Sequence, residues 1–512
     1  MFLRRLNKED EFVMDENNAI KPKSIKVNYI FNLAYEVFAL LTPLITTPYV
    51  SRVLGADGVG IYSYTNSIAQ YFILFGNLGI ATYGQMQIAA CREERKETSR
   101  VFYELWILRA LTMAISLGIY MVVSFTATEY REARLIFGVI IFASIFVFNN
   151  LFGTNYMTWL FRGIEDFSKV VIRNFIVKIV MIVAVFIFVK TKDDVNIYIL
   201  LIALSTLLGN ITFLFSMRNV LCRVELKSLN ILRHTKQCLV FFIPTIATSV
   251  YTLLDKTMLG MLTEGTAQNG YYEQAHKIEQ ILLVAITSLN TIMRSRMSFL
   301  FQHGQIDEMR ARLNRSISFI LLISIPMAAG LIGIAPNFIP LFLGEGFEES
   351  IILLQIFSLL LIVIGLSNCL NTHYLGPSGR QGKNNYVLIA GAAVNFIFNL
   401  MAIPTYGAVG AACASVLAET LILIGYLYLI RDFFKFKTMI KLGWKYAIAG
   451  LVMGCFVSYM GTLPGKSFVI LVLQIINGAV LYGIILCLLR DKFLFENIKM
   501  IIYKVKTKIH AR

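Results

Sequence analysis

Long hydrophobic blocks alternate with short polar segments along nearly the whole chain. Within each block the apolar residues are continuous rather than alternating with polar ones. A helix of about 20 apolar residues crosses the ~30 Å hydrocarbon core of a bilayer. Only helices and closed barrels satisfy their backbone hydrogen bonds in lipid, and continuous blocks favour helices. The pattern therefore predicts an all-α integral membrane protein.

About fourteen spans are predicted, and no connecting segment is long enough to hold a soluble catalytic domain. Their boundaries are accurate to a few residues. The spans are placed at residues 27–50, 60–83, 101–125, 135–160, 167–189, 195–217, 237–259, 272–293, 316–336, 350–372, 384–404, 407–430, 442–461 and 467–489.

Composition agrees with this interpretation. Hydrophobic residues make up 57% of the 512 residues and charged residues only 15%, against roughly 25% charged in soluble domains. The seven cysteines form no CxxC pair, which argues against a disulfide framework and against a metal site. The polar first segment is followed by a block long enough to remain as a span, so no cleavable signal peptide is predicted.

The net charge of +16 is distributed as a topology signal. Most of the 47 Lys and Arg residues fall in every second connecting segment and in the two tails. Cytosolic loops carry such an excess, so both termini are predicted to be cytosolic. Because the positive charge lies between spans rather than on one soluble face, a nucleic-acid partner is not expected.

An internal repeat links two segments, residues 60–70 and 270–280. Both open a span that enters from the outside, and both follow a span that contains a proline. We therefore predict two six-helix lobes related as parallel repeats, followed by two C-terminal helices. The matched pairs are Gly60 and Gly270, Tyr62 and Tyr272, Ile68 and Ile278, and Gln70 and Gln280.

The predicted domain organisation follows from the spans and the repeat. It consists of a cytosolic N-terminal tail (1–26), an N-lobe (27–217), a cytosolic linker (218–236), a C-lobe (237–430), spans 13 and 14 (431–490) and a basic cytosolic tail (491–512).

Ionisable residues inside spans are costly and are candidates for function. Arg109 lies five residues after Glu104, about 140° around a helix, whereas Arg100 pairs with Glu104 at i,i+4. Arg109 therefore faces either a cavity or a neighbouring helix. Lys178, one turn from Asn174, faces a cavity or forms a structural ion pair.

Two carboxylates are candidates for ion coupling. Glu36 in the first span either binds a coupling cation or proton, or neutralises Arg109 or Lys178. Glu419, near the middle of the twelfth span, either couples transport to H⁺ or Na⁺ or belongs to a structural pair.

Two polar stripes are predicted on helix faces. They line an aqueous cavity or form hydrogen bonds between helices, which also use Thr and Asn. The stripe on the seventh span consists of Thr245, Thr248, Thr252 and Asp255 with Lys256 beside it, and that on the eighth consists of His276, Glu279, Thr287, Asn290 and Arg294.

Four segments carry a family resemblance. Residues 40–72, 159–180, 253–281 and 379–419, in this order and spacing, resemble bacterial polysaccharide (O-antigen type) flippases of the multidrug/oligosaccharidyl-lipid/polysaccharide exporter superfamily. The chain departs from the family at Arg162, where Gln is usual, and at Ser295, where Pro is usual.

The resemblance implies a two-lobed, non-enzymatic transporter of the bacterial cytoplasmic membrane. It would move undecaprenyl-diphosphate-linked oligosaccharide to the outer leaflet by alternating access driven by an ion gradient. The expected partners are the lipid-linked glycan, the bilayer, and the polymerase and glycosyltransferases of the same pathway. No cofactor is expected other than a coupled H⁺ or Na⁺.

The site residues follow from this expectation and from the stripes. The cations predicted to hold the diphosphate are Arg109, Lys178 and Lys256, the predicted cavity-lining polar residues are Asn174, Thr248, Thr252, Asp255, Glu279 and Asn290, and the ion-coupling candidates are Glu36 and Glu419. The alternatives are a multidrug extrusion pump, which would need an acidic cavity, a membrane glycan polymerase or ligase, which would need a catalytic outside loop, and a structural scaffold.

Overall fold

The computed structural model describes residues 25–126, 158–164, 167–217, 220–465, 467–497 and 499. The predicted span at 135–160 falls outside these residues except for its last three. The side chains of Glu36, Thr248 and Thr252 also lie outside the described part of the structure.

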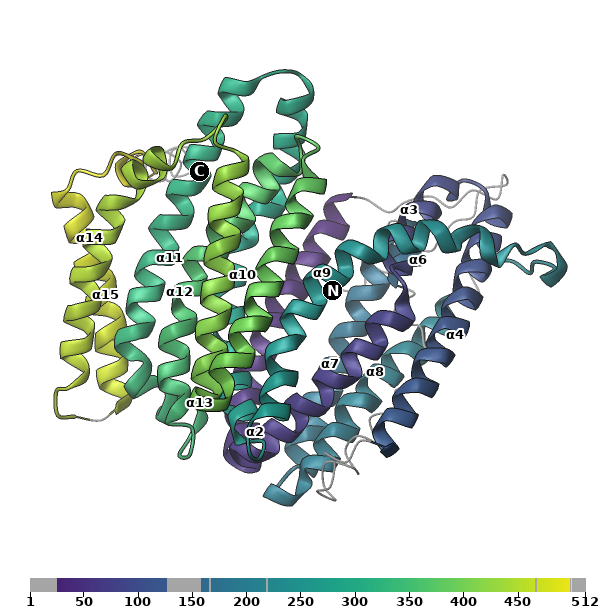
Figure 1. Ribbon diagram of the computed structural model, residues 1–512, viewed down its shortest axis with the longest axis horizontal. Coiled ribbons are helices and arrows are strands. Elements are labelled where there is room, and N and C mark those ends of the chain that lie inside the picture. Colours follow the sequence, from purple (N-terminus) through teal and green to yellow (C-terminus); the bar gives the residue numbers. More distant parts are fainter. Residues whose placement is uncertain are drawn as a thin grey trace, which may run out of the picture. The chain divides into compact units, whose positions relative to one another are not determined.

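The described residues are helical, with no strand among them, and this confirms the predicted all-α membrane fold (Figure 1). Seven of the helices are long and apolar enough to cross a membrane. The helices are α2 (Ile25–Asn77), α3 (Ile80–Cys91), α4 (Arg95–Thr126), α6 (Thr158–Gly163), α7 (Phe167–Phe188), α8 (Val195–Met217), α9 (Thr235–Leu262), α10 (Ala267–Gln302), α11 (Ile306–Leu343), α12 (Glu349–Leu370), α13 (Gln381–Leu429), α14 (Phe436–Gly461) and α15 (Ser467–Leu488), with the short helices η2 (Lys192–Asp194), η3 (Leu226–Ser228), η4 (Ile231–His234) and η5 (Asn371–Leu375).

Two of the helices each consist of two predicted spans joined at a glycine. α2 is interrupted at Gly55 (φ 68°) and α13 at Gly407 (φ 52°). Glycine tolerates this left-handed region because it has no Cβ, so the chain turns there without a loop. The second arm of α2 ends at Asn77 rather than at the predicted residue 83, because Leu78 and Gly79 also take positive φ values.

The described helices form two compact units. Unit 1 contains residues up to 54 and residues 61–253, and unit 2 contains residues 55–60 and 254 onward. The division falls inside α9, whereas the sequence placed the linker between lobes at 218–236. The lobe boundaries remain a prediction.

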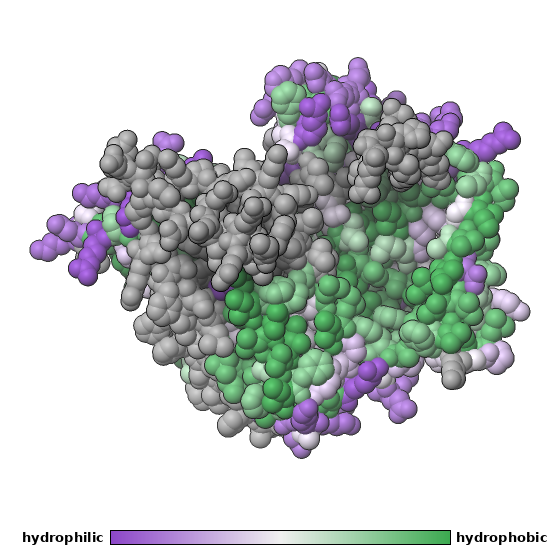
Figure 2. All heavy atoms as spheres, turned by 180° about the vertical axis from the view of Figure 1, so that it is seen from behind, coloured by the Kyte–Doolittle hydropathy of each residue, from purple (hydrophilic) through white to green (hydrophobic). Residues whose placement is uncertain are grey.

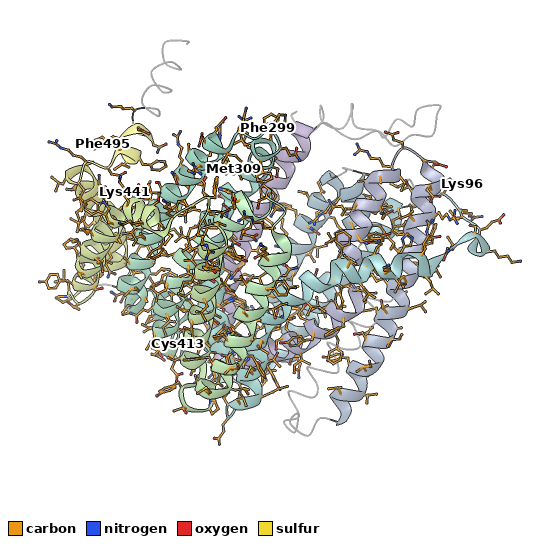
Figure 3. The ribbon with its side chains drawn as sticks, turned by 45° about the horizontal axis from the view of Figure 1, so that its top comes forward. Lys96, Phe299, Met309, Cys413, Lys441 and Phe495 are labelled. Atoms are coloured by element: carbon orange, nitrogen blue, oxygen red, sulfur yellow. The ribbon has the colours of Figure 1, made fainter. Side chains whose placement is uncertain are left out.

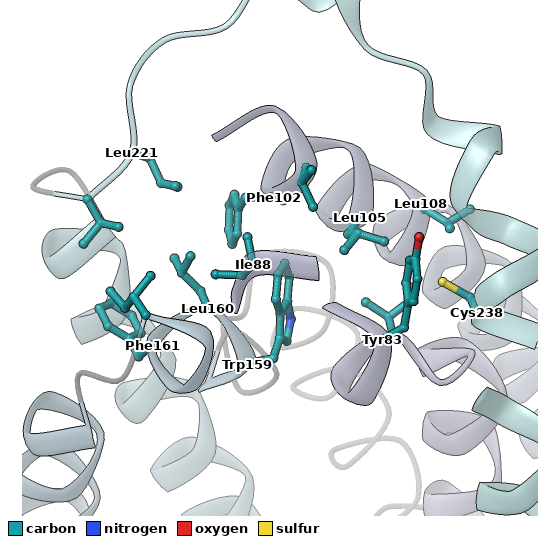
Figure 4. Packing of buried hydrophobic residues seen from close by; sticks show 14 residues of the cluster. Tyr83, Ile88, Phe102, Leu105, Leu108, Trp159, Leu160, Phe161, Leu221 and Cys238 are labelled. Atoms are coloured by element: carbon teal, nitrogen blue, oxygen red, sulfur yellow. The ribbon is translucent and has the colours of Figure 1, made fainter. Parts of the chain in front are cut away.

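The core of unit 1 lies where α3, α4 and α6 meet. Trp159 stacks on Phe102 with ring centroids 5.3 Å apart, and Leu105, Leu160 and Ile88 are fully buried beside them (Figure 4). Burying such a side chain contributes about 1.5–3 kcal/mol. This cluster fixes α3 and α4, which lie beside the candidate site described below.

The segment before α9 is held against α4 by a buried carboxylate. Glu104, fully buried, accepts hydrogen bonds from the backbone N–H of Asn230 (2.7 Å), from Arg233 Nη2 (2.6 Å) and, at 2.8 Å, interacts with His234 Nε2. The predicted pair with Arg100 is also present, at 3.4 Å. Burial lowers the pKa of the His234 imidazole. The start of α9 is therefore fixed within unit 1.

Within unit 2, the helix ends that the charge pattern predicts to be cytosolic gather together. Phe299 at the end of α10, Met309 at the start of α11, Lys441 in α14 and Phe495 after α15 lie toward one end, and Cys413 lies toward the other (Figure 3). Hydrophobic side chains cover the flanks of the helices and hydrophilic ones gather at their ends (Figure 2). Both observations fit a bundle that crosses a bilayer.

The repeated segments meet in a reciprocal contact within unit 2. A Cβ on Gly60 would lie 1.8 Å from the carbonyl oxygen of Thr266, and a Cβ on Gly270 would lie 2.0 Å from that of Ala56. Residue 60 corresponds to 270 and residue 56 to 266, each by the same offset of 210. Two-fold related surfaces contact each other in this way, which supports the parallel repeat.

Candidate functional site

A polar pocket opens within unit 1 between the second arm of α2, the turn into α3, and α9. Its volume is about 420 Å³, and its polar lining consists of Asn66, Gln70, Asn77, Thr82 and Thr245. Small-molecule sites occupy roughly 300–1,000 Å³. None of the described residues that line it is charged.

Helical spacing explains why three amides line this pocket. Asn66, Gln70 and Asn77 are separated by four and seven residues, which places them on one face of α2. Asn66 Oδ1 accepts a hydrogen bond from Gln70 Nε2 at 3.3 Å. The spacing of this stripe is visible in the sequence, although amides carry no charge and so stand out less in a span than ionisable residues do.

Arg109 lies directly behind the pocket. Its side chain is 2% exposed, and its Nε donates a 3.0 Å hydrogen bond to Asn77 Oδ1. Because a guanidinium only donates, Asn77 must present its oxygen to Arg109, and this fixes the orientation of the amide at the edge of the pocket. α4 is held in place by Thr112, whose hydroxyl donates to Gly76 O at 2.6 Å.

Lys178 and Asn174 both lie on α7 of unit 1, half-buried. Arg173 holds Asn174, since its Nη2 donates to Asn174 Oδ1 at 2.6 Å. Neither Lys178 nor Asn174 is among the described residues that line the pocket. Of the residues singled out in the sequence, Thr245 therefore lines the pocket directly, and Arg109 contacts it through Asn77.

Asp255 is the centre of a buried hydrogen-bonded cluster in unit 2. Its carboxylate accepts hydrogen bonds from Tyr272 Oη and Asn399 Nδ2, each at 2.6 Å, and from Ser415 Oγ. The cluster joins α9, α10 and both arms of α13. Sequence analysis missed Asn399 and Ser415, although Asn395 and Asn399 at i,i+4 form a polar pair in an apolar span.

Lys256, which is half-buried, belongs to a charge cluster around the buried carboxylate of Glu273. Its Nζ lies 2.7 Å from Glu273 Oε2, and Lys277 Nζ lies 3.1 Å from Glu273 Oε1. The Glu273 carboxylate therefore bridges the two ammonium groups, and Lys256 is held in place by an ion pair.

Glu279 is buried in unit 2 with only part of its carboxyl group satisfied. Its side chain is 0% exposed, and Oε2 accepts a 3.0 Å hydrogen bond from Gln280 Nε2. Oε1 has no partner among the described residues. Glu419 is half-buried on the second arm of α13, a helix that packs against α10. Asn290, further along α10, is also buried, and neither of its side-chain polar atoms has a described partner.

The described residues contain no cluster of three or more His, Cys, Asp or Glu side chains that could hold a metal ion. The Asp255 carboxylate is surrounded by hydroxyl and amide groups rather than by further carboxylates. Its two oxygens are occupied by these three donors.

A helical membrane bundle with buried charges and a polar pocket among its helices has the architecture of a transporter. Residues 25–293 match the model of a family described as polysaccharide biosynthesis proteins. Since this match spans more than half of the 512 residues, the chain belongs to that family. The resemblance found in the sequence is confirmed.

Curated relatives cover most of the chain. A protein of Escherichia coli (strain K12) named as an O-antigen transporter is 22% identical over 411 residues, which are 80% of this chain and 97% of that protein. A protein of Shigella dysenteriae with the same name is 25% identical over 389 residues, 75% of this chain and 94% of that protein.

Solved structures show the same fold. The inward closed conformation of lipid II flippase MurJ matches with a TM-score of 0.70 at 17% identity, covering 91% of this chain and 99% of that chain. An inward-facing multidrug resistance transporter of the MATE family matches with a TM-score of 0.58 at 16% identity, covering 78% and 96%. At these identities the likeness is one of fold.

Proposed function

We propose that this protein is a flippase that moves a lipid-linked oligosaccharide from the inner to the outer leaflet of the bacterial cytoplasmic membrane. It would act as a non-enzymatic, secondary-type transporter in the synthesis of a cell-surface polysaccharide. Its family, its relatives named as O-antigen transporters, and its transporter fold support this function. The predicted charge bias of the connecting segments supports both termini in the cytosol.

The polar pocket of unit 1 is the observation that carries the proposal. Each unpaired hydroxyl that enters hydrocarbon costs roughly 2–7 kcal/mol, so a glycan crosses only where protein groups replace water. Asn66, Gln70 and Asn77 offer both donors and acceptors without charge, which suits sugar hydroxyl and acetamido groups. A volume of about 420 Å³ accommodates a small saccharide.

The charged residues take complementary roles in this proposal. Within unit 1, Lys178 on α7 provides a cation for the diphosphate. Arg109 contributes to glycan binding rather than to diphosphate binding, because it orients the pocket residue Asn77. An inside-negative potential would favour export of about two negative charges by ~4–5 kcal/mol per 100 mV.

Export of organic cations, as by a multidrug pump, is the alternative. Such a pump would line its cavity with carboxylates to bind its substrate. The described lining of the pocket contains amides and hydroxyls but no carboxylate. The pocket therefore favours a neutral, hydroxyl-rich ligand.

The test is reconstitution of the purified protein in liposomes with an undecaprenyl-diphosphate oligosaccharide. Exposure of the glycan on the opposite leaflet is followed with and without an imposed potential. Gln70→Met, which removes hydrogen bonding from the pocket at similar volume, is expected to slow flipping severalfold. Ser288→Ala, which removes an exposed hydroxyl on α10, is the matched control and is expected to leave the rate unchanged.

Exposure no faster than in empty liposomes would overturn the proposal. If such liposomes instead exchange an organic cation dye for protons, the protein is a drug pump. If flipping is intact in Gln70→Met, the function stands and the pocket is not its glycan site.

A further inference from the structure

The first turns of α14 in unit 2 extend beyond the predicted membrane span. The hydropathy pattern places the start of this span at residue 442, whereas the helix begins at Phe436. Lys441 on this extension and Phe495 after α15 lie toward the same end of unit 2 (Figure 3). Because the charge pattern predicts that this end is cytosolic, we expect these turns at the level of the lipid headgroups.

One face of α14 packs into unit 2 and thereby defines the face that points outward. A Cβ on Gly450 would lie 2.4 Å from Ile325 Cγ2 of α11, so the two helices are in close contact there. At about 100° per residue, positions 437, 441, 444 and 448 lie on the opposite side of α14. The buried residues of α14 are Tyr446, Ala449, Gly450, Met453 and Val457.

Lysine side chains form a stripe on this outward face. Lys437, Lys441 and Lys445 follow one another at intervals of four residues. Lys437 and Lys441 are exposed, and no carboxylate of the described residues forms an ion pair with either of them. By contrast, Arg380 at the start of α13 has its Nη2 2.7 Å from Asp432 Oδ2. The stripe therefore presents positive charge that the described part of the protein does not neutralise.

Exposed apolar side chains accompany the lysine stripe. Phe436, Ile440, Trp444 and Ile448 also recur every four residues, and their side chains are 44–56% exposed. This row leads from the lysines into the predicted span, and tryptophan is typical of the membrane interface. Ammonium groups beside an apolar row match the anionic headgroup and the acyl chain of one lipid. An acidic protein surface would supply the anion without the hydrocarbon.

The start of α14 is fixed to the end of α15. Lys445 Nζ donates a 3.0 Å hydrogen bond to the carbonyl oxygen of Arg490, and Tyr446 Oη donates to Asp491 Oδ1 at 3.2 Å. Asp491 Oδ1 also accepts a hydrogen bond from the backbone N–H of Leu494 at 2.9 Å. The stripe therefore lies on a pre-organised corner of unit 2, which lowers the entropic cost of binding a ligand.

We propose that the outward face of the first turns of α14 is a binding site for an anionic phospholipid of the cytosolic leaflet, such as phosphatidylglycerol. The ammonium groups of Lys437 and Lys441 bind the headgroup phosphate. An acyl chain lies along Ile440, Trp444 and Ile448. A lipid bound in this way holds the last two helices of unit 2 at a fixed depth in the bilayer. The site does not depend on the proposed flippase function.

Trp444 serves as the reporter in a fluorescence experiment. The purified protein is reconstituted in phosphatidylcholine vesicles that contain a small, equal fraction of brominated phosphatidylglycerol or brominated phosphatidylcholine, with bromine on the acyl chains. The contribution of Trp444 is the emission that is lost in Trp444→Phe. Brominated phosphatidylglycerol is expected to quench this emission more strongly than brominated phosphatidylcholine does.

Two double variants test whether the lysine stripe causes this preference. Lys437→Gln with Lys441→Gln is expected to abolish it, because each lysine near an anionic surface contributes about fivefold in affinity. Lys190→Gln with Lys192→Gln, which removes two exposed lysines at η2 in unit 1, is the matched control and is expected to keep it. Since all four lysines are exposed, neither double variant is expected to change Tm.

Three results would overturn the proposal. Equal quenching by the two brominated lipids in the wild type would leave an acidic protein as the partner of the lysines. A preference that survives in the Lys437→Gln, Lys441→Gln variant would place the lipid elsewhere. Complete displacement of phosphatidylglycerol by equimolar undecaprenyl diphosphate would assign the lysines to the transported lipid. Because no transport is measured, failure of the proposed function leaves each of these readouts intact.

Discussion

Replacing Arg109 by methionine separates two roles for this buried cation. The sequence predicts that it holds the diphosphate, whereas the structure places its Nε 3.0 Å from Asn77 Oδ1, behind the pocket. If Arg109 only orients Asn77, its loss removes the fixed direction of one neutral hydrogen bond to the glycan. Such a bond is worth about 0.5–1.5 kcal/mol, or roughly a twofold to twelvefold loss of affinity.

If Arg109 instead contacted the diphosphate directly, its loss would weaken substrate binding much more. Truncating one partner of a buried, hydrogen-bonded charge pair costs about 2–5 kcal/mol, which is more than about 30-fold in affinity. The assay is therefore the Kd of two ligands for the protein in nanodiscs. One is the lipid-linked oligosaccharide, and the other is undecaprenyl diphosphate without its glycan.

Arg109→Met is expected to weaken binding of the oligosaccharide severalfold and to leave the glycan-free lipid unchanged. Arg109→Lys retains one donor and is expected to recover part of the loss. Asn77→Ala is expected to match Arg109→Met, and the double variant to lose nothing further, because both changes remove one interaction. A loss beyond 30-fold on both ligands would refute the orienting role and show that Arg109 contacts the diphosphate.

Further predictions concern stability. Gly60→Ala and Gly270→Ala place a Cβ against the backbone of Thr266 and Ala56. Each is expected to reduce the free energy of unfolding by about 1–3 kcal/mol and therefore to lower Tm. Gly118→Ala, whose Cβ would have no atom within 4 Å, is the control, and equal Tm values for all three variants would exclude the close contact. Glu104→Gln removes the charge from the buried acceptor of Arg233, which is 35% exposed and keeps Glu97 at 3.5 Å, so the expected cost is about 1–3 kcal/mol, measured as a fall in the denaturation midpoint. Because burial lowers the pKa of His234, the unfolded chain binds the proton first as pH falls through about 6.5, so stability is expected to decline below that pH. In His234→Asn this part of the pH dependence is expected to be absent, and an unchanged slope would show that His234 is not its source.

The fold was largely predictable because the bilayer imposes length and polarity on each helix. Continuous apolar blocks predicted α8 at residues 195–217, as the structure has it, and placed α7, α9, α12 and α15 within three residues. For α14 they predicted the end at residue 461, whereas the helix begins six residues before the predicted start at 442. The end of α2 was missed, since a positive φ at Leu78 depends on packing rather than on hydropathy. The family was also predictable from the order of short segments, which the comparison confirmed.

The sequence by itself determined which residues are costly in a membrane: Arg109, Lys178, Lys256, Asp255, Glu279 and Glu419 stand out by type and position alone. It could not determine their partners, because these come from distant parts of the chain. Only the tertiary structure paired Lys256 with Glu273, surrounded Asp255 with Tyr272, Asn399 and Ser415, and left one oxygen of Glu279 without a described donor. The physical reason is that the desolvation cost of a charged group depends on its own burial. The hydrogen bonds and ion pairs that offset this cost come from residues that are neighbours only in three dimensions. The same limit applies to the pocket, whose amides share a helix face in the sequence but become a site only when α9 and Arg109 close around them.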